Sequence, residues 1–159
     1  MDFWKKLFKN DVQDVDYYAE GMELMGVGKY HDALTSFRLA LRDDPTDPTV
    51  LQQIAMTYTR IGMTDQAVKT YRTVLERDPH SSGANYGLAF LLLRNDQKTE
   101  AAQHLEAFLA SAPSGPEASR HVEHARRTLA ELRGEADGTP TVEGAGEPAD
   151  AARPGGDAP

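Results

Sequence analysis

The chain has 159 residues, with 25 acidic and 17 basic side chains, and its formal net charge of −8 argues against a polybasic nucleic-acid-binding protein. With 40% hydrophobic and 26% charged residues, the composition is that of one globular unit accompanied by a flexible segment. Because the sequence contains no cysteine, disulfide frameworks, thiolate zinc sites and thiol nucleophiles are excluded.

Residues 1–13 form an amphipathic segment. On a helix, four large apolar side chains would share one face, with Lys5, Lys6 and Lys9 around its flank. Three roles fit such a segment and stay open: it packs over the unit that follows, contacts a partner, or lies weakly on a membrane surface. The four candidate anchors are Phe3, Trp4, Leu7 and Phe8.

The start of the chain lacks the continuous apolar core and the cleavage site of a secretory signal. No later stretch contains 18 uncharged apolar residues, which a membrane-spanning helix would need. We therefore expect a cytoplasmic protein, with at most a peripheral contact to a membrane.

A repeat of 34 residues organises the middle of the chain. Pro45, Pro79 and Pro113 are spaced by this period, which is typical of solenoid proteins. Five further columns keep the same register: Gly21, Ala55 and Ala89; Leu24, Tyr58 and Leu92; Ala33, Ala67 and Ala101; Phe37, Tyr71 and Leu105; and Leu41, Leu75 and Leu109.

Each period divides into two helices joined by a turn, because apolar residues recur at spacings of three and four on both sides of a break. Gly28 and Gly62 mark the turn in the first two periods, and Asp96-Gln97-Lys98 takes that place in the third. Each proline then ends its period, because proline cannot continue a helix. The pattern predicts helices near 13–26, 30–42, 48–61, 64–77, 82–94 and 98–111.

A further helix is predicted from Pro116 to Arg133, with a capping box formed by Ser114 and Glu117 and with Gly134 at its end. One narrow stripe of this helix is apolar and the rest is polar, as expected of a helix that covers the end of an array. The stripe consists of Ala118, Val122, Ala125, Leu129 and Leu132.

Residues 135–159 combine six acidic side chains and one arginine with many Gly, Pro and Ala. This composition predicts an acidic disordered tail. Its net charge of −5 leaves −3 for residues 1–134, so most of the acidity does not belong to the folded part.

The 34-residue pattern resembles the tetratricopeptide repeat family, which places a small residue at position 8, Ala at 20, an aromatic at 24 and Pro at 32. The resemblance covers residues 14–115 in three units, 14–47, 48–81 and 82–115. It implies an all-α, right-handed superhelical solenoid of three helix-turn-helix units, with residues 116–134 as a C-terminal capping helix. Glu20, Asn85 and Leu105 depart from the pattern, which has two large apolar residues and an aromatic at these places.

The resemblance also implies a binding surface, because the first helix of each unit in this family faces a concave groove with positions 2, 5, 9, 12 and 13. Methionine and aromatic side chains dominate this surface, which suits an amphipathic helix or an extended peptide with apolar anchors. Its two arginines are equivalent in register and would hold an acidic group. The implied groove residues are Val15, Tyr18, Met22, Met25, Gln52, Met56, Thr59, Arg60, Tyr86, Phe90, Leu93 and Arg94.

In the best-known groove of the family, Lys and Asn at positions 5 and 9 of the first unit capture a C-terminal carboxylate. The corresponding residues here are Tyr18 and Met22, so this mode of capture is not expected.

We expect no enzymatic activity, no cofactor and no metal. His121 and His124 form an i, i+3 pair without a third ligand in register, and a solvated helix face is the preferred interpretation. The acidic run at 43–47 lacks the alternating ligands and the glycine of a calcium loop. A groove open to water also lacks the enclosed, preorganised site that catalysis requires.

The sequence therefore predicts a non-catalytic protein–protein interaction module, acting as an adaptor, scaffold or assembly factor that binds a partner helix or peptide. Two alternatives stay open: a self-associating peripheral membrane scaffold attached through the Phe/Trp/Lys segment, and a regulatory subunit of a larger complex. No nucleic-acid partner is expected.

Overall fold

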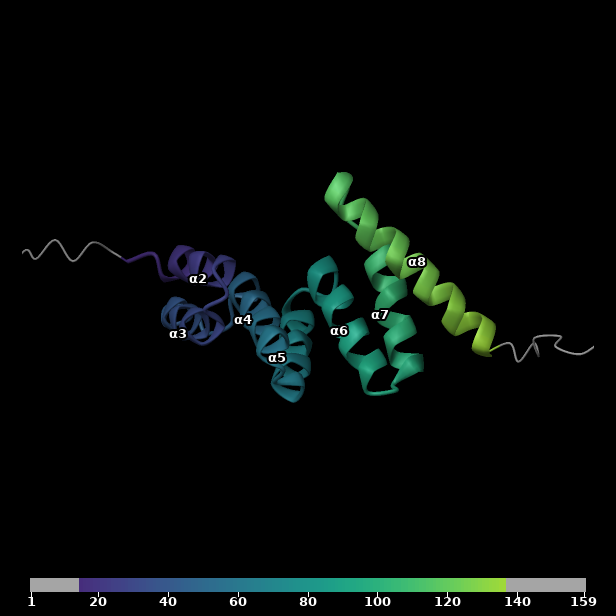
Figure 1. Cartoon of the computed structure of the whole chain (residues 1–159), viewed down its shortest axis with the longest axis horizontal. Coiled ribbons are helices and arrows are strands. Elements are labelled where there is room, and N and C mark those ends of the chain that lie inside the picture. Colours follow the sequence, from purple (N-terminus) through teal and green to yellow (C-terminus); the bar gives the residue numbers. More distant parts are fainter. Residues whose placement is uncertain (1–14, 137–159) are drawn as a thin grey trace, which may run out of the picture.

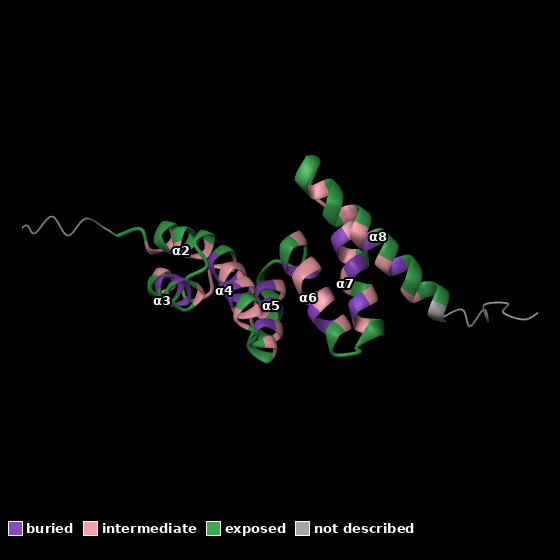
Figure 2. Ribbon diagram, viewed as in Figure 1, coloured by how far each residue is buried: buried purple, intermediate pink, exposed green. Residues whose placement is uncertain are grey.

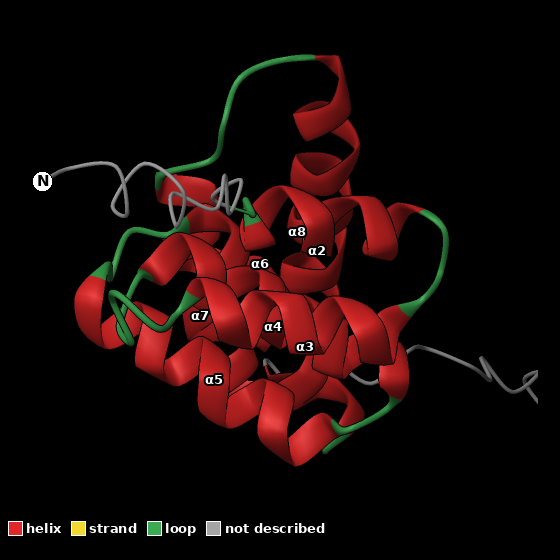
Figure 3. Cartoon of the chain, turned by 90° about the vertical axis from the view of Figure 1, so that its left-hand side faces the viewer, coloured by secondary structure: helices red, strands yellow, loops and turns green. Residues whose placement is uncertain are grey.

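The computed structural model describes residues 15–136, which form seven helices and no strand (Figure 1, Figure 3). Three antiparallel hairpins follow one another: α2 (Tyr17–Gly26) with α3 (Tyr30–Ala40), α4 (Pro48–Ile61) with α5 (Thr64–Arg77), and α6 (Ser82–Arg94) with α7 (Lys98–Ala110). The last helix, α8 (Pro116–Ala136), lies obliquely across α7. The all-helical solenoid is thus confirmed, whereas its handedness and the predicted unit boundaries stay predictions. The anchors Phe3, Trp4, Leu7 and Phe8 and the tail from residue 137 onward lie outside the described residues.

Side-chain caps fix the start of the first helix of each hairpin, α2, α4 and α6. α4, α5 and α6 have the predicted bounds. Asp47 caps α4 by accepting hydrogen bonds from the amides of Thr49 (2.8 Å) and Val50 (3.3 Å), and Pro48 occupies the first helical position. α2 starts at residue 17, whereas the predicted helix starts at residue 13, because Asp16 accepts from the amide of Ala19 at 3.0 Å and so fixes the start of α2.

The start and end of α8 differ from the prediction. Gly115, with a φ of +127°, directly precedes the helix, and its carbonyl accepts from the amide of Ser119 at 3.0 Å. Ser114 is therefore one residue too early to cap α8, and the predicted capping box is wrong. The helix also continues through Gly134 to Ala136.

The turn inside each hairpin uses one left-handed residue per repeat. Gly28 has a φ of +77° and Gly62 a φ of +89°, and Asp96 takes the same place in the third hairpin with a φ of +58°. The prediction of a turn at 96–98 is confirmed. Since Asp96 carries a Cβ, it adopts at some cost a conformation that glycine adopts freely.

We expect Asp96→Gly to raise the free energy of unfolding by about 1 kcal/mol, because glycine removes the left-handed strain at an exposed position. Urea denaturation followed by circular dichroism would measure the change. The neighbouring Asn95→Gly is the control: Asn95 has a φ of −95°, so glycine there should bring no gain. Equal gains in both variants would contradict the strain argument.

The core divides into three clusters, one at each interface along the array, and buried residues face inward between the helices (Figure 2). Phe37 and Ile54 centre the first cluster, and Tyr71 and Leu88 belong to the second. The third cluster joins the last hairpin to α8, which confirms that the apolar stripe of this helix packs on the array. Its buried members are Ala89, Leu105, Phe108, Ala125 and Leu129.

Small residues allow the two helices of a hairpin to approach closely. A Cβ on Gly21 would lie 2.5 Å from a ring carbon of Phe37, which is too close for any side chain. Ala55 and Ala89, the corresponding residues of the next two units, are completely buried. The spacing of small residues in the sequence therefore reflects this contact.

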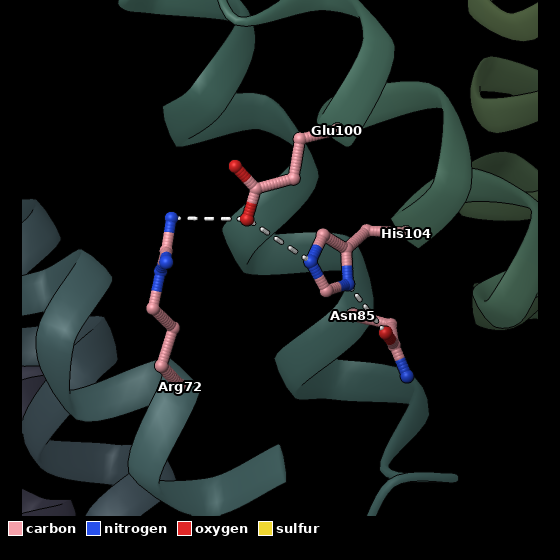
Figure 4. Close-up of polar contacts among 4 residues, drawn as sticks. All are labelled: Arg72, Asn85, Glu100 and His104. Atoms are coloured by element: carbon pink, nitrogen blue, oxygen red, sulfur yellow. Dashed lines mark hydrogen bonds and ion pairs between the residues drawn. The ribbon is translucent and has the colours of Figure 1, made fainter.

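Asn85, which replaces the expected apolar residue, is 2% exposed and fully hydrogen-bonded (Figure 4). Its amide nitrogen donates to the carbonyls of Pro79 and Ser81, both at 3.1 Å. Its oxygen lies 2.9 Å from Nδ1 of His104, and this nitrogen therefore carries the proton. The departure from the pattern thus creates a polar link between α6 and α7.

Glu100 connects the polar contact between Asn85 and His104 to the second hairpin. This carboxylate lies 3.8 Å from Nε2 of His104 and forms an ion pair of 2.9 Å with Arg72 on α5 (Figure 4). Burial lowers the pKa of His104 and Arg72 adds to this effect, while Glu100 acts in the opposite direction. The imidazole is therefore held in its neutral form more strongly than a free histidine.

We expect stability to fall when the pH is lowered through the region below about 6.5, the ordinary histidine pKa. The unfolded chain binds a proton at His104 at higher pH than the folded chain does, so acidification favours unfolding until the lower folded-state pKa is passed. Urea midpoints measured over a pH series should show this slope, and His104→Gln should flatten it. The exposed His31 offers the control, because His31→Gln should leave the slope unchanged.

Candidate functional site

An open groove with a volume of about 770 Å³ runs along α4 and α6, the first helices of the second and third hairpins. Its lining repeats with the sequence period, because three pairs of residues are 34 positions apart and lie on equivalent turns of the two helices. The pairs are Gln52 with Tyr86, Met56 with Phe90, and Arg60 with Arg94. Because each pair keeps the 34-residue register, the groove has a polar end, an apolar middle and a basic end.

Two glycines of α6 bring the second hairpin close to the groove. A Cβ on Gly87 would lie 2.5 Å from the ring of Tyr71, and one on Gly83 would lie 2.6 Å from the amide of Gln52. Tyr71, from the second helix of its hairpin, therefore reaches the groove lining while it stays 3% exposed. Burial raises the pKa of Tyr71 to about 12, despite the opposing effects of Thr59 and Arg60, so its phenol is neutral at physiological pH.

The basic end of the groove carries two exposed guanidinium groups. Arg60 and Arg94 both line the groove, and neither forms an ion pair with another residue of the described part. Their positive charges are therefore available to a carboxylate of a ligand.

The α8 helix forms one wall of the groove through Ala118 and His121. The ring of His121 meets Tyr86 edge-on with 5.0 Å between centroids. His124 stacks on Phe90 at 4.5 Å, and its Nδ1 lies 2.9 Å from the hydroxyl of Tyr86. The predicted solvated face holds for His121, which is exposed, but both rings also pack on aromatic side chains of the groove, and His124 is half-buried.

Burial also raises the pKa of Tyr86, whose ring lies 5.0 Å from that of Phe108 as well. Tyr86 is thus the centre of an aromatic cluster that includes both histidines of α8. Within residues 15–136, no group of three His, Cys, Asp or Glu side chains is arranged to hold a metal ion.

The structure brings seven of the twelve predicted groove residues into this groove. They are Gln52, Met56, Thr59, Arg60, Tyr86, Phe90 and Arg94. Sequence reasoning missed the lining residues that come from other elements or from other positions of α6. These are Tyr71, Ser82, Gly83, Gly87, Leu91, Phe108, Pro113, Ala118 and His121.

The other five predicted residues do not line this groove. Tyr18 packs against Phe37, with 6.0 Å between ring centroids, and lines a separate cleft together with Val15. The sulfur of Met25 accepts a hydrogen bond from the buried Thr57 hydroxyl at 3.2 Å. Met22 is 42% exposed on α2, and Leu93 packs against the second core cluster.

No helix of the described residues is both long enough and apolar enough to cross a bilayer.

The chain is a helical repeat protein, because its helical hairpins stack with a period of 34 residues and leave a groove along their first helices. The tetratricopeptide repeat family model matches residues 62–120, from the turn of the second hairpin into α8. Over the matched residues the chain is thus similar to the tetratricopeptide repeat family.

Two curated relatives share part of the sequence. The TPR repeat-containing protein MJ1428 of Methanocaldococcus jannaschii is 35% identical over 60 residues, which are 38% of this chain and 11% of that protein. The photosystem I assembly protein Ycf3 of Synechococcus sp. (strain CC9902) is 33% identical over 79 residues, which are 46% of each. The chain thus spans less than half the length of these relatives.

The fold is similar to that of the type III secretion chaperone SycD of Yersinia enterocolitica, whose structure was solved in complex with a peptide of the translocator YopD. The TM-score is 0.69 at 19% sequence identity, and the match covers 76% of this chain and 92% of that one. At this identity the similarity concerns the fold.

Proposed function

We propose that the chain is a non-catalytic protein-interaction module, an adaptor, scaffold or assembly factor, which binds an amphipathic helix or an extended peptide of a partner in the groove between α4 and α6. The observation that carries the proposal is the repeated lining, in which Met56 and Phe90 are followed one turn later by Arg60 and Arg94. Apolar anchors of the partner would occupy the middle of the groove, and an acidic side chain would pair with the arginines.

The similar proteins support this proposal. SycD is a chaperone whose structure contains a peptide, and Ycf3 is named as an assembly protein. Both descriptions fit a protein that acts by holding a segment of another chain.

The chemistry of the groove also favours binding over catalysis. Its lining contains no carboxylate, and the Thr59 hydroxyl donates to the carbonyl of Ala55 at 2.9 Å rather than to a base. The lining therefore offers no carboxylate as a general base, and its Thr59 hydroxyl is not directed at one.

A random-peptide library selected on the full chain would test the proposal. We expect a consensus with apolar residues at helical or alternating spacing and at least one acidic residue. Binding of a labelled selected peptide, measured by fluorescence anisotropy, should weaken at least tenfold in Met56→Glu and in the double variant Arg60→Glu with Arg94→Glu.

Matched controls lie outside the groove. Met63, which is 37% exposed in the turn before α5, serves for Met63→Glu, and the exposed Arg126 on α8 serves for Arg126→Glu. Both control variants should bind like the wild type. If the groove and control variants bind the peptide equally well, the groove is not the binding site.

A further inference from the structure

Large apolar side chains stay exposed mainly at one end of the array. Among the described residues, five are more than a third exposed, and Val15, Met22, Val27 and Leu39 all belong to the first hairpin or flank it. The opposite end differs, because α8 covers the last hairpin there. Figure 3 looks onto the first hairpin, where the described residues provide no comparable covering helix.

A cleft with a volume of about 640 Å³ opens at this uncovered end. It lies between the start of α2, the end of α3 and the start of α4, and apolar atoms of Val15, Tyr18 and Leu39 contribute to its lining. Its charged lining residues are Asp16, Asp43 and Asp47 against the single Arg42. The cleft therefore combines apolar surface with an excess of negative charge, and it is separate from the groove between α4 and α6.

The adjacent segment of the chain has the complementary composition. Residues 1–10 contain three lysines and one aspartate, together with four large apolar side chains. Residue 10 is only five residues before Val15, a distance of at most about 17 Å along an extended chain. Because the segment is tethered beside the cleft, its effective concentration there is high, and weak contacts suffice for occupancy.

We propose that residues 1–10 fold back onto this cleft, with Phe3, Trp4, Leu7 and Phe8 against its apolar surface and the lysines facing its carboxylates. The segment closes the first hairpin as α8 closes the last one. This contact is independent of peptide binding in the groove and goes beyond the proposed function.

The only tryptophan of the chain, Trp4, lies within the segment and reports on the contact without a label. In the full chain we expect a blue-shifted Trp4 emission and protection from acrylamide quenching. Leu39→Asp and Val15→Asp should each shift the emission to the red and raise the quenching constant severalfold, while the circular dichroism spectrum stays the same. Met63→Asp is the matched control, because Met63 is as exposed as Leu39 but lies outside the cleft, and it should change nothing.

Three outcomes would overturn the proposal. The first is wild-type Trp4 that is quenched as readily as free tryptophanamide. The second is protection that depends on protein concentration and accompanies a dimer in sedimentation, which would assign the cleft to a second copy of the chain. The third is protection that appears only with vesicles of phosphatidylserine and phosphatidylcholine, which would assign the segment to a lipid surface.

Discussion

Replacing Leu129 by aspartate is expected to lower the free energy of unfolding by about 2 to 4 kcal/mol. Leu129 is 5% exposed and packs at the interface between α8 and the third hairpin, beside Leu105 and Phe108. An aspartate at this position would place a carboxylate in an apolar cluster. Since the array has only three hairpins in the described part, loss of its end cover should weaken the whole stack rather than α8 alone.

Urea denaturation followed by circular dichroism would measure this effect, with Ala130→Asp as the control. Ala130 is the next residue of the same helix and is exposed, so an aspartate there should change stability by no more than about 0.5 kcal/mol. Equal urea midpoints for the wild type and Leu129→Asp would show that α8 does not stabilise the array.

Much of the fold could be predicted because local chemistry and the repeat register agree. Asp47 with Pro48 fixes the start of α4, and the left-handed positions 28, 62 and 96 end the first helix of each hairpin at the period of the repeat. The predicted start of α2 is too early, because the pattern of apolar residues does not reveal that Asp16 caps the helix. A single capping hydrogen bond can shift the start of a helix by several residues, and the pattern of apolar residues does not reveal it.

The sequence predicts only part of the groove. The repeat register shows which side chains share one face of a helix, but it does not show how separate helices pack against each other. The register identified Met56, Phe90 and both arginines. It could not show that α8 crosses the third hairpin at an angle that brings His121 against Tyr86, since this depends on packing between segments 35 residues apart. The off-stripe position of the histidines predicts a solvated face, but in the structure their rings also pack on Tyr86 and Phe90 of the third hairpin.

Asn85, which departs from the repeat pattern, could have been recognised from the sequence as a hydrogen-bonded residue. A polar residue in a buried column implies hydrogen-bonding partners, because an unpaired buried amide is costly. The sequence did not identify those partners, since His104 is 19 residues away on another helix and the carbonyls of Pro79 and Ser81 belong to the preceding turn.

Asn85→Leu, which restores the apolar residue typical of the family, is expected to destabilise this chain by about 3 kcal/mol. The leucine would remove the hydrogen-bond partner of the half-buried His104 Nδ1–H and of the Pro79 carbonyl. It would also add volume at a site that is 2% exposed. From the family pattern alone, the same substitution would be expected to stabilise.

A double-mutant cycle separates the two effects. In Asn85→Leu combined with His104→Leu, the polar partner is removed together with the amide, so the loss should be smaller than the sum of the two single losses by about 1 kcal/mol or more. Urea midpoints and slopes of all four proteins give the coupling energy. Two residues that share a partly buried hydrogen bond are expected to be coupled. Strict additivity, or a gain in stability on Asn85→Leu alone, would therefore show that the contact between Asn85 and His104 does not hold α6 to α7.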